Sequence, residues 1–565
     1  MATHADTTAL TDALTHLRDE LSGVRLALAA PGADQARATR DELVGQIDDY
    51  LLPRLRQMDA PLLMVVGGST GAGKSTLVNS LVGAEVSSAG VLRPTTRAPV
   101  LVCHPDDVSW FQDDRILPSL HRSTGAPAGA GGLQLVATDA VPPGLGLLDA
   151  PDIDSVVVAN RELAGQLLAA ADAWLFVTTA ARYADAVPWD MLHAARERGT
   201  GLAVVLNRVP PEAIEEVAAH LREMLGTEGL GDAAVLVVPE TRLQDERLPP
   251  AALAPVRDWF DALAADAQAR GTLVRRTLDG ALASVVPRVH GVATTLTEQL
   301  AAATRLGEAV QDAFAGAHDE IEEAVKGGAL LRGEVLARWH EVVGTGDLMR
   351  ALESRVGWLR DRIRATVTGR KTANAELETA VQTGVDALVQ TAADKAAERA
   401  VAAWRHDPAG RALLGDDAGA LDGASPQLAA RTAEEVRAWQ GHVFDLVREE
   451  GADKRSTARL ASLGVNGAGL VVMVGVFAST GGLTGAEVVV AGGTSALSQK
   501  VLEAIFGDQA VRALAARART DLLTRVDALL AEESARFTQR LQPLAPAPED
   551  PERLRAALVA IEQAQ

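Results

Sequence analysis

The chain contains a segment whose residue types and spacing are those of a phosphate-binding loop. It meets the pattern G-x-x-x-x-G-K-[ST] in full. In such a loop the backbone N–H groups converge on phosphate oxygens, the lysine reaches the β and γ phosphates, and the serine hydroxyl ligates Mg²⁺. We therefore predict that a nucleoside triphosphate is bound by Gly68, Ser69, Thr70, Gly71, Ala72, Gly73, Lys74, Ser75 and Thr76.

The residues on either side of this loop predict the strand and the helix that hold it in place. Residues 62–66 are an apolar run typical of a buried strand, and residues 75–82 have the pattern of a helix. The N-terminus of a helix is an anion-binding site because its first N–H groups are unpaired and its dipole favours negative charge. This context favours a phosphate site over a chance glycine-rich loop.

Two further positions are expected to complete a hydrolytic site. Thr96 precedes an apolar strand and is a candidate second Mg²⁺ ligand that senses the γ-phosphate. Asp149 ends the apolar run 145–148, where a carboxylate can hold Mg²⁺ through water. We predict Lys74, Thr96 and Asp149 as catalytic residues and Ser75, Thr96 and Asp149 at the metal. The alternatives are an ordinary turn at each of the two positions.

Asn207 and Arg208 are the predicted base-binding residues. They follow the apolar run 202–206, where a purine-reading loop lies in such a fold. We expect Asn207 to orient this loop and the Arg208 stem to cover the base. Arg93 and Arg97 flank Thr96 and could stabilise transition-state charge, although solvated or structural roles are the alternative.

The order of these motifs resembles that of the dynamin-like GTPases, in particular the bacterial members. The loop continues as T-L-V-N-S-L, residues 96–101 are close to the switch sequence T-R-R-P-L-V, and residues 149–151 match the D-x-P of a D-x-P-G motif. Helices precede and follow the nucleotide domain, with an apolar segment late in the helical arm. The resemblance implies GTP hydrolysis with Mg²⁺, a homodimer or larger self-assembly through the GTPase face and stalk, and tethering or remodelling of membranes.

Three departures from the family pattern bear on rate and base choice. Thr70 and Gly71 stand where the family has a glutamine–serine pair, so the usual water-positioning side chain is missing. Asp152 replaces the glycine of D-x-P-G, and its carboxylate would repel a γ-phosphate. Pro210 replaces the aspartate that accepts two hydrogen bonds from guanine, a strongly discriminating pair. GTP is the substrate that the resemblance implies, and ATP is the alternative.

The hydrophobic pattern divides the chain into five segments. Residues 1–59 are predicted to be helical, 60–249 a P-loop GTPase domain, 250–459 a helical bundle or stalk, 460–500 a glycine-rich apolar hairpin, and 501–565 helices that return to the bundle. The predicted fold class is therefore an α/β P-loop GTPase domain flanked by an extended all-α bundle.

Within 60–249, short apolar runs alternate with helical stretches, which favours a mainly parallel sheet. The expected strands are residues 62–66, 99–103, 145–148, 174–177, 202–206 and 234–238. Residues 125–132 are glycine-rich and are predicted to be a mobile surface loop. In the helical segment 1–59, leucines at alternating four- and three-residue spacing form one apolar stripe that needs partner helices from elsewhere in the chain.

The segment 460–500 is the predicted membrane-interacting part. Residues 460–486 carry no charge and have small residues at four-residue spacing, which lets helix backbones approach closely in a bilayer. Thr and Gly residues interrupt it, so a hairpin that enters a lipid membrane fits better than one straight span. A buried core hairpin in a soluble bundle is the alternative.

Composition narrows the partners and the compartment. A formal net charge of −21 repels nucleic-acid phosphates, so no nucleic-acid partner is expected. The single Cys103 lies in an apolar run and is expected to be buried, which leaves no internal disulfide and suits a reducing cytosol. Residues 1–19 are polar and lack an apolar h-region, so we expect no secretory signal. We expect a cytoplasmic protein that is peripheral or inserted at the inner face of the cell membrane.

Two other function classes stay open from the sequence. One is a soluble regulatory P-loop NTPase whose helical arms act on a protein partner. The other is a nucleotide-binding scaffold with little turnover, which Asp152 and Pro210 favour. The basic residues between Arg355 and Lys371 could contact lipid headgroups or an acidic helix, and a solvated helix face is the alternative.

Overall fold

The computed structural model describes residues 4–87, 98–113, 115–124, 132–155, 157–327, 363–450, 472–473, 476 and 508–565. They form two compact units. The sheet unit comprises residues 1–26, 32–298 and 546–565, and the helical unit comprises residues 27–31 and 299–545. The predicted boundaries after residues 59 and 249 both fall within the sheet unit.

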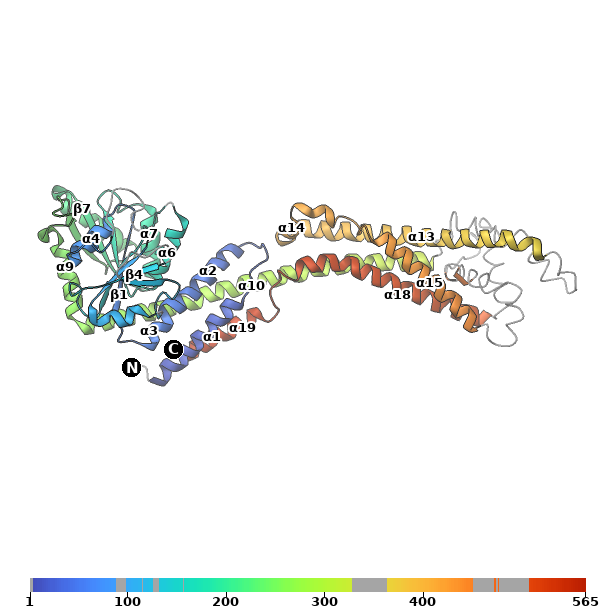
Figure 1. The fold of residues 1–565 in the computed structure, drawn as a ribbon, viewed down its shortest axis with the longest axis horizontal. Coiled ribbons are helices and arrows are strands. Elements are labelled where there is room, and N and C mark those ends of the chain that lie inside the picture. The colour runs from blue at the N-terminus through green and yellow to red at the C-terminus, as the bar shows by residue number, and fades with distance from the viewer. Residues whose placement is uncertain are drawn as a thin grey trace. The chain divides into compact units, whose positions relative to one another are not determined.

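The sheet unit is built on one eight-stranded sheet with the order β3-β4-β2-β5-β1-β6-β7-β8 (Figure 1). Every neighbouring pair is parallel except β2 and β5, which confirms the predicted mainly parallel sheet. The strands are β1 (Leu62–Gly68), β2 (Val100–Cys103), β3 (His121–Thr124), β4 (Gly132–Ala137), β5 (Leu145–Asp149), β6 (Ala173–Thr179), β7 (Gly201–Val209) and β8 (Ala234–Pro239).

Six of these strands contain the apolar runs that predicted them, and two were not predicted. β3 reads His-Arg-Ser-Thr and is partly exposed, so it offers no apolar run. β4 begins at Gly132, a residue that we placed in the glycine-rich loop. That prediction is wrong for Gly132, because its backbone pairs with His121 of β3. Residues 125–131 of the predicted loop lie outside the described residues.

Helices cover both faces of the sheet because its strands are apolar on both sides. One face packs against α4 (Lys74–Val82), α9 (Pro250–Ala265) and the start of α10 (Ala267–Lys326). The other packs against α5 (Val108–Gln112), α6 (Val158–Ala169), α7 (Ala186–Glu197) and α8 (Ile214–Thr227). Short 3₁₀ turns, η2 (Pro105–Asp107) and η3 (Pro211–Ala213), precede α5 and α8.

Cys103 is fully buried in β2, as predicted. Burial, assisted by the negative charge of Asp107, raises the pKa of its thiol to about 12.

The N-terminal leucine stripe is buried against helices from distant parts of the chain, as its pattern required. Leu14, Leu17 and Leu21 of α1 (His4–Gly23) share one apolar cluster with residues of α10 and with α19 (Asp550–Ala564). The same cluster takes in α2 (Ala33–Gln46), the π-helical turn η1 (Ile47–Leu51) and α3 (Leu52–Arg56). The final helix α19 therefore belongs to the sheet unit.

A buried ion pair joins α3 to the sheet at the amino end of β1. Arg54 pairs with Asp172, which immediately precedes β6, and also donates to the carbonyl oxygens of Ala60 (3.0 Å) and Pro61 (3.2 Å). Asp172 Oδ2 accepts from the backbone N–H of Leu63 at 2.8 Å. The pair therefore fixes the start of β1 against the helix before it.

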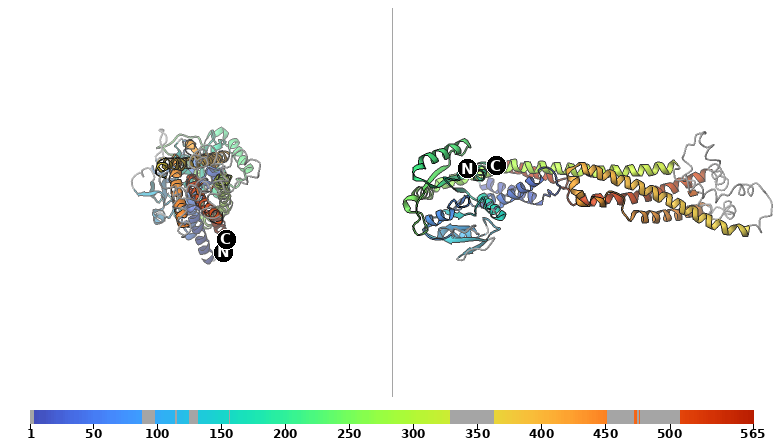
Figure 2. Two further views of the ribbon diagram at one scale, coloured as in Figure 1. Left: turned by 90° about the vertical axis from the view of Figure 1, so that its right-hand side faces the viewer. Right: turned by 90° about the horizontal axis from the view of Figure 1, so that it is seen from above.

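The helical unit contains the remainder of α10 and four further described α-helices. These are α13 (Ile363–His406), α14 (Pro408–Leu414), α15 (Leu428–Glu450) and α18 (Asp508–Leu541), with a 3₁₀ turn η5 (Gly415–Ala420) after α14. Their long helices run side by side, as Figure 1 and the right-hand view of Figure 2 show. The core is apolar and includes Trp404, which packs edge-on against Phe537 with 5.4 Å between the ring centroids.

Apolar residues at helical spacing on α13 and α18 face this core. Val381 and Val385 are buried, and so are Leu514, Leu522 and Leu529.

Three residues of the predicted membrane segment are described. Val472, Met473 and Val476 are buried in the core of the helical unit, and Arg519 of α18 donates to the Val476 carbonyl oxygen at 3.0 Å. The rest of 460–500 lies outside the described residues. Among the helices that are described, none has both the length and the apolar character that a membrane span needs.

Candidate nucleotide site

The loop between β1 and α4 needs glycine at both of its ends. Gly68 has φ +148°, and a Cβ there would lie 2.0 Å from the Val177 carbonyl oxygen of β6. Gly73 has φ +97°, and a Cβ there would lie 2.6 Å from Asn207 Nδ2. Backbone in this left-handed region favours glycine, and neither position has room for a side chain. The close approach of β6 and β7 therefore explains both glycines that the motif pattern fixes.

Lys74 begins α4, and its ammonium folds back over the loop. The side chain is 5% exposed. Its Nζ donates to the carbonyl oxygens of Gly68 (2.9 Å) and Ser69 (3.3 Å) and forms an ion pair with Asp152. The three ammonium hydrogens therefore have three acceptors within the protein.

Asp149 lies at the carboxyl end of β5, beside the loop and fully buried. Its Oδ2 accepts from the Ser87 hydroxyl at 2.5 Å, and the Ser75 hydroxyl is a second donor to this carboxylate. Burial raises the pKa of the Asp149 carboxyl, against these hydrogen bonds and the charge of Lys74. Its Oδ1 is buried and accepts no hydrogen bond within the described part of the chain.

An uncompensated buried carboxylate oxygen beside a serine hydroxyl fits a hard divalent cation, which prefers oxygen ligands. The residues present therefore suit Mg²⁺.

A second polar network ties the loop to residues 150–155, which we call the post-β5 segment. Asp154 Oδ1 accepts from the Thr70 N–H (2.6 Å) and from the Thr70 hydroxyl (2.7 Å). Arg182, in the turn after β6, donates to Asp154 (2.8 Å) and to the Thr70 carbonyl oxygen (3.1 Å). Burial opposes the charged form of Asp154, but the hydrogen bonds from Thr70 and Arg182 outweigh it and lower the pKa.

Asn207 and Arg208 end up in different environments. Asn207 is buried, and its Nδ2 donates to the Ala72 carbonyl oxygen of the loop at 2.8 Å. Its Oδ1 accepts from the Arg208 N–H at 2.9 Å. Arg208 has φ +55° and is exposed. The amide thus braces the loop, while the arginine is turned outward.

The structure brings most of the predicted site residues together at the carboxyl edge of the sheet. Lys74, Ser75, Asp149 and Asn207 all contact the loop or each other, and Thr76 lies in the first turn of α4. Thr96, Arg93 and Arg97 lie outside the described residues.

The sequence analysis missed Asn79, Ser87, Asp154 and Arg182. Asn79 binds the backbone of Val86 and Ser87 and so positions the Ser87 hydroxyl. Only Asp154 had a sequence signal, as a second acidic residue just after the D-x-P match.

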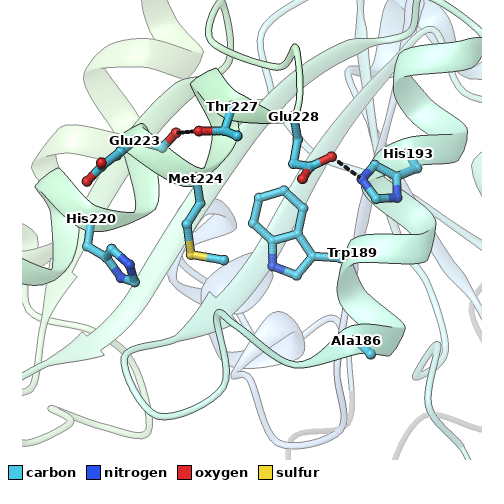
Figure 3. A pocket seen from close by; sticks show the side chains of 8 residues that line it. All are labelled: Ala186, Trp189, His193, His220, Glu223, Met224, Thr227 and Glu228. Carbon is cyan, nitrogen blue, oxygen red and sulfur yellow. Dashed lines mark hydrogen bonds and ion pairs between the residues drawn. The ribbon is translucent and has the colours of Figure 1, made fainter.

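A separate hollow lies between α7 and α8 (Figure 3). It has a volume of about 460 Å³. At one end, His193 Nε2 lies 3.1 Å from a carboxylate oxygen of Glu228. The side chains of His220 and Glu223 lie at the other end. Trp189 and Met224 lie between them. None of the loop residues lines this hollow.

The sheet and the loop define an α/β domain with a phosphate-binding loop, combined with a helical unit, as the sequence predicted. No known family model matches the chain. A probable chloroplastic transmembrane GTPase of Arabidopsis thaliana, FZO-like, is 26% identical over 188 residues. That match covers 32% of this chain and 19% of the Arabidopsis protein, so the chain spans about a fifth of that relative's length.

Solved structures of bacterial dynamins are similar over almost the whole chain. One, from an oligomerised bacterial dynamin pair described as sensing and tethering membranes, covers 93% of this chain and 95% of its own, with 9% identity and a TM-score of 0.39. The bacterial dynamin GTPase LeoA from ETEC covers 100% and 99%, with 11% identity and a TM-score of 0.24. Era of Aquifex aeolicus covers 37% and 57%, with 18% identity and a TM-score of 0.24. The chain thus resembles the bacterial dynamin-like GTPases.

Proposed function

We propose that the protein is a dynamin-like GTPase that hydrolyses GTP and couples the cycle to a membrane. One observation carries the enzymatic part. Lys74, Ser75 and Asp149, whose Oδ1 accepts no hydrogen bond from any described residue, meet at the end of a glycine loop that begins a helix. A helix N-terminus, a lysine and a metal-binding acid at one place are what phosphoryl transfer to water needs.

The chain's own residues have distinct roles in this proposal. The loop N–H groups and Lys74 hold the β and γ phosphates, Ser75 and Thr96 ligate the metal, and Asp149 holds it through water. Mg²⁺, when bound, neutralises charge on the phosphate oxygens. Thr70 lacks the side-chain amide with which a glutamine would orient the attacking water. We therefore assign that task to backbone groups near Thr96 or to a second copy of the chain.

GTP is the proposed substrate because of the resemblance. The hydrogen bond from Asn207 to the Ala72 carbonyl oxygen supports a role for Asn207 in bracing the loop. This role does not depend on which base is bound. Direct competition between GTP and ATP therefore decides base preference.

Phosphate release by the full chain tests the enzymatic proposal. With Mg²⁺, we expect GTP to be hydrolysed and ATP to be the poorer substrate. Lys74→Ala should lower the rate at least about a hundredfold, because it removes charge stabilisation aimed at the transferred group. Lys395→Ala, which removes an exposed lysine of the helical unit, is the matched control and should leave the rate unchanged. Equal rates for Lys74→Ala and wild type would refute the proposal.

The membrane part of the proposal rests on the small-residue apolar segment 460–500. Nucleotide-dependent flotation of the full chain with vesicles that contain anionic lipid tests it. We expect the protein to float with vesicles in the presence of a non-hydrolysable GTP analogue.

One observation favours a second candidate, a soluble regulatory GTPase that acts on a protein partner. Val472, Met473 and Val476 are buried in the core of the helical unit, as a core hairpin would require. Failure to float with any nucleotide and any lipid would favour this candidate.

A further inference from the structure

We propose that Asp152 is a counter-ion that a nucleotide must displace from Lys74, and that it thereby sets how well the site distinguishes nucleotides of different charge. The inference rests on the proposed nucleotide site and goes beyond it, since it assigns a specificity-determining role to a residue outside the phosphate-loop motif.

The Lys74 ammonium already has a partner for each of its hydrogens. There are three hydrogens, and the carbonyl oxygens of Gly68 and Ser69 and the carboxylate of Asp152 supply three acceptors. The two carbonyl oxygens belong to the loop itself and stay beside the lysine. A phosphate oxygen can therefore reach the ammonium only by replacing the carboxylate of Asp152.

The ion pair of Lys74 with Asp152 is largely buried. The Lys74 side chain is 5% exposed and that of Asp152 is 20% exposed. Charges at such a site are only partly screened by water, so a carboxylate left next to a phosphate raises its free energy. Asp152 and Asp149 already repel each other, since the charge of Asp152 helps to raise the pKa of Asp149.

The Asp152 side chain can move away from Lys74 without detaching the post-β5 segment from the loop. Asp154 is anchored to Thr70 and to Arg182 by three hydrogen bonds of the loop network. Ile153 N–H donates to the Gly68 carbonyl oxygen at 3.4 Å, a long bond. Asp152 has solvent on one side, so its side chain can turn outward while Asp154 keeps the post-β5 segment attached to the loop.

The consequence is a site that penalises negative charge near Lys74. A triphosphate carries one more negative charge than a diphosphate, so the repulsion by Asp152 is greater for the triphosphate. Removal of the carboxylate should therefore raise triphosphate affinity more than diphosphate affinity.

The test is equilibrium binding of a fluorescent non-hydrolysable GTP analogue and of fluorescent GDP to the full chain with Mg²⁺. Asp152→Asn keeps the shape and removes the charge. We expect its affinity for the triphosphate to rise about tenfold, as expected for loss of one nearby like charge, and its affinity for GDP to rise by less. Asp152→Glu, which restores the charge, should bind close to wild type.

Asp139→Asn is the control, because it makes the same change at an exposed carboxylate of the same unit that contacts neither Lys74 nor the phosphate loop. We expect no gain in triphosphate affinity from it. An equal gain for both nucleotides, or no gain in Asp152→Asn while wild type binds, would overturn this inference and leave the proposed function intact. If folded wild type binds neither nucleotide, the proposed function falls, and this inference with it.

Discussion

Strand β1 has a buried cation–carboxylate pair at each end, and the two pairs differ in how completely they are enclosed. At the amino end, the side chains of Arg54 and Asp172 are 6% and 0% exposed. At the carboxyl end, Lys74 is equally buried, but Asp152 is 20% exposed. The first pair is held by backbone groups on both partners, whereas within the described residues the Asp152 carboxylate binds only Lys74.

The difference separates a structural ion pair from an exchangeable one. A fully buried carboxylate that loses its cation keeps only its hydrogen bonds, which do not offset the cost of burying the charge, so the pair at the amino end must stay closed. The pair at the carboxyl end has a charged partner on a segment with access to solvent, and a phosphate can take its place. The same chemical pairing thus fixes one end of the strand and leaves the other available for a ligand.

Breaking the pair at the amino end should have the largest effect on stability. We expect Arg54→Ala to lower the free energy of unfolding by about 3–5 kcal/mol, because Asp172 is left buried and uncompensated. Urea denaturation followed by circular dichroism measures this. The control is Arg276→Ala, which removes a solvent-exposed pair with Asp232 and should cost less than about 1 kcal/mol. Similar losses in the two variants would contradict the structural role of Arg54.

A third carboxylate near the amino end, Asp49, sharpens the comparison because it has a hydrogen-bond donor in place of a close cation. It accepts from Gln166 at 2.9 Å, and burial raises its pKa from 3.8 to about 6. The folded state therefore binds a proton at Asp49 more tightly than the unfolded state. The contribution of Asp49 to the free energy of unfolding is fully present below about pH 4 and is lost as the pH rises through 6.

Asp49→Asn should remove this pH dependence. At pH 7.5 we expect it to raise the free energy of unfolding by up to about 3 kcal/mol, with a much smaller gain at pH 4.5. Denaturation at both pH values measures the difference. Asp41→Asn, at an exposed position, is the control. A gain of the same size at both pH values would show that charge burial is not the cause.

Breaking the pair at the carboxyl end should have the smallest effect on stability. Asp152→Asn is expected to change the free energy of unfolding by less than about 1 kcal/mol, since the Asn oxygen can still accept and Lys74 keeps two carbonyl partners. Denaturation without nucleotide measures it. A loss comparable to that of Arg54→Ala would place Asp152 in the structural class.

The sequence predicted the central strands and the loop because both are local patterns. Apolar runs marked β1, β5, β6 and β7, and the glycine–lysine motif marked the phosphate loop. β3 escaped because its stability comes from pairing with β4 and not from apolar side chains of its own.

The contacts that distinguish the two ends of β1 could not be predicted in the same way. Arg54 and Asp172, and likewise Thr70 and Arg182, are far apart in the chain and meet only once the sheet has formed. The sequence did mark Asp152 as unusual, through the glycine that it replaces. Its partner Lys74 could be identified only from the structure.

The chemistry of Cys103 makes these proposals accessible to spectroscopy. A buried thiol with a pKa of about 12 is almost wholly protonated at neutral pH and out of reach of maleimide reagents. A second cysteine placed on the surface can therefore be labelled selectively without replacing the native one. Val157, which is 43% exposed and follows the post-β5 segment, is such a position. A fluorophore attached there would report in real time when that segment responds to nucleotide.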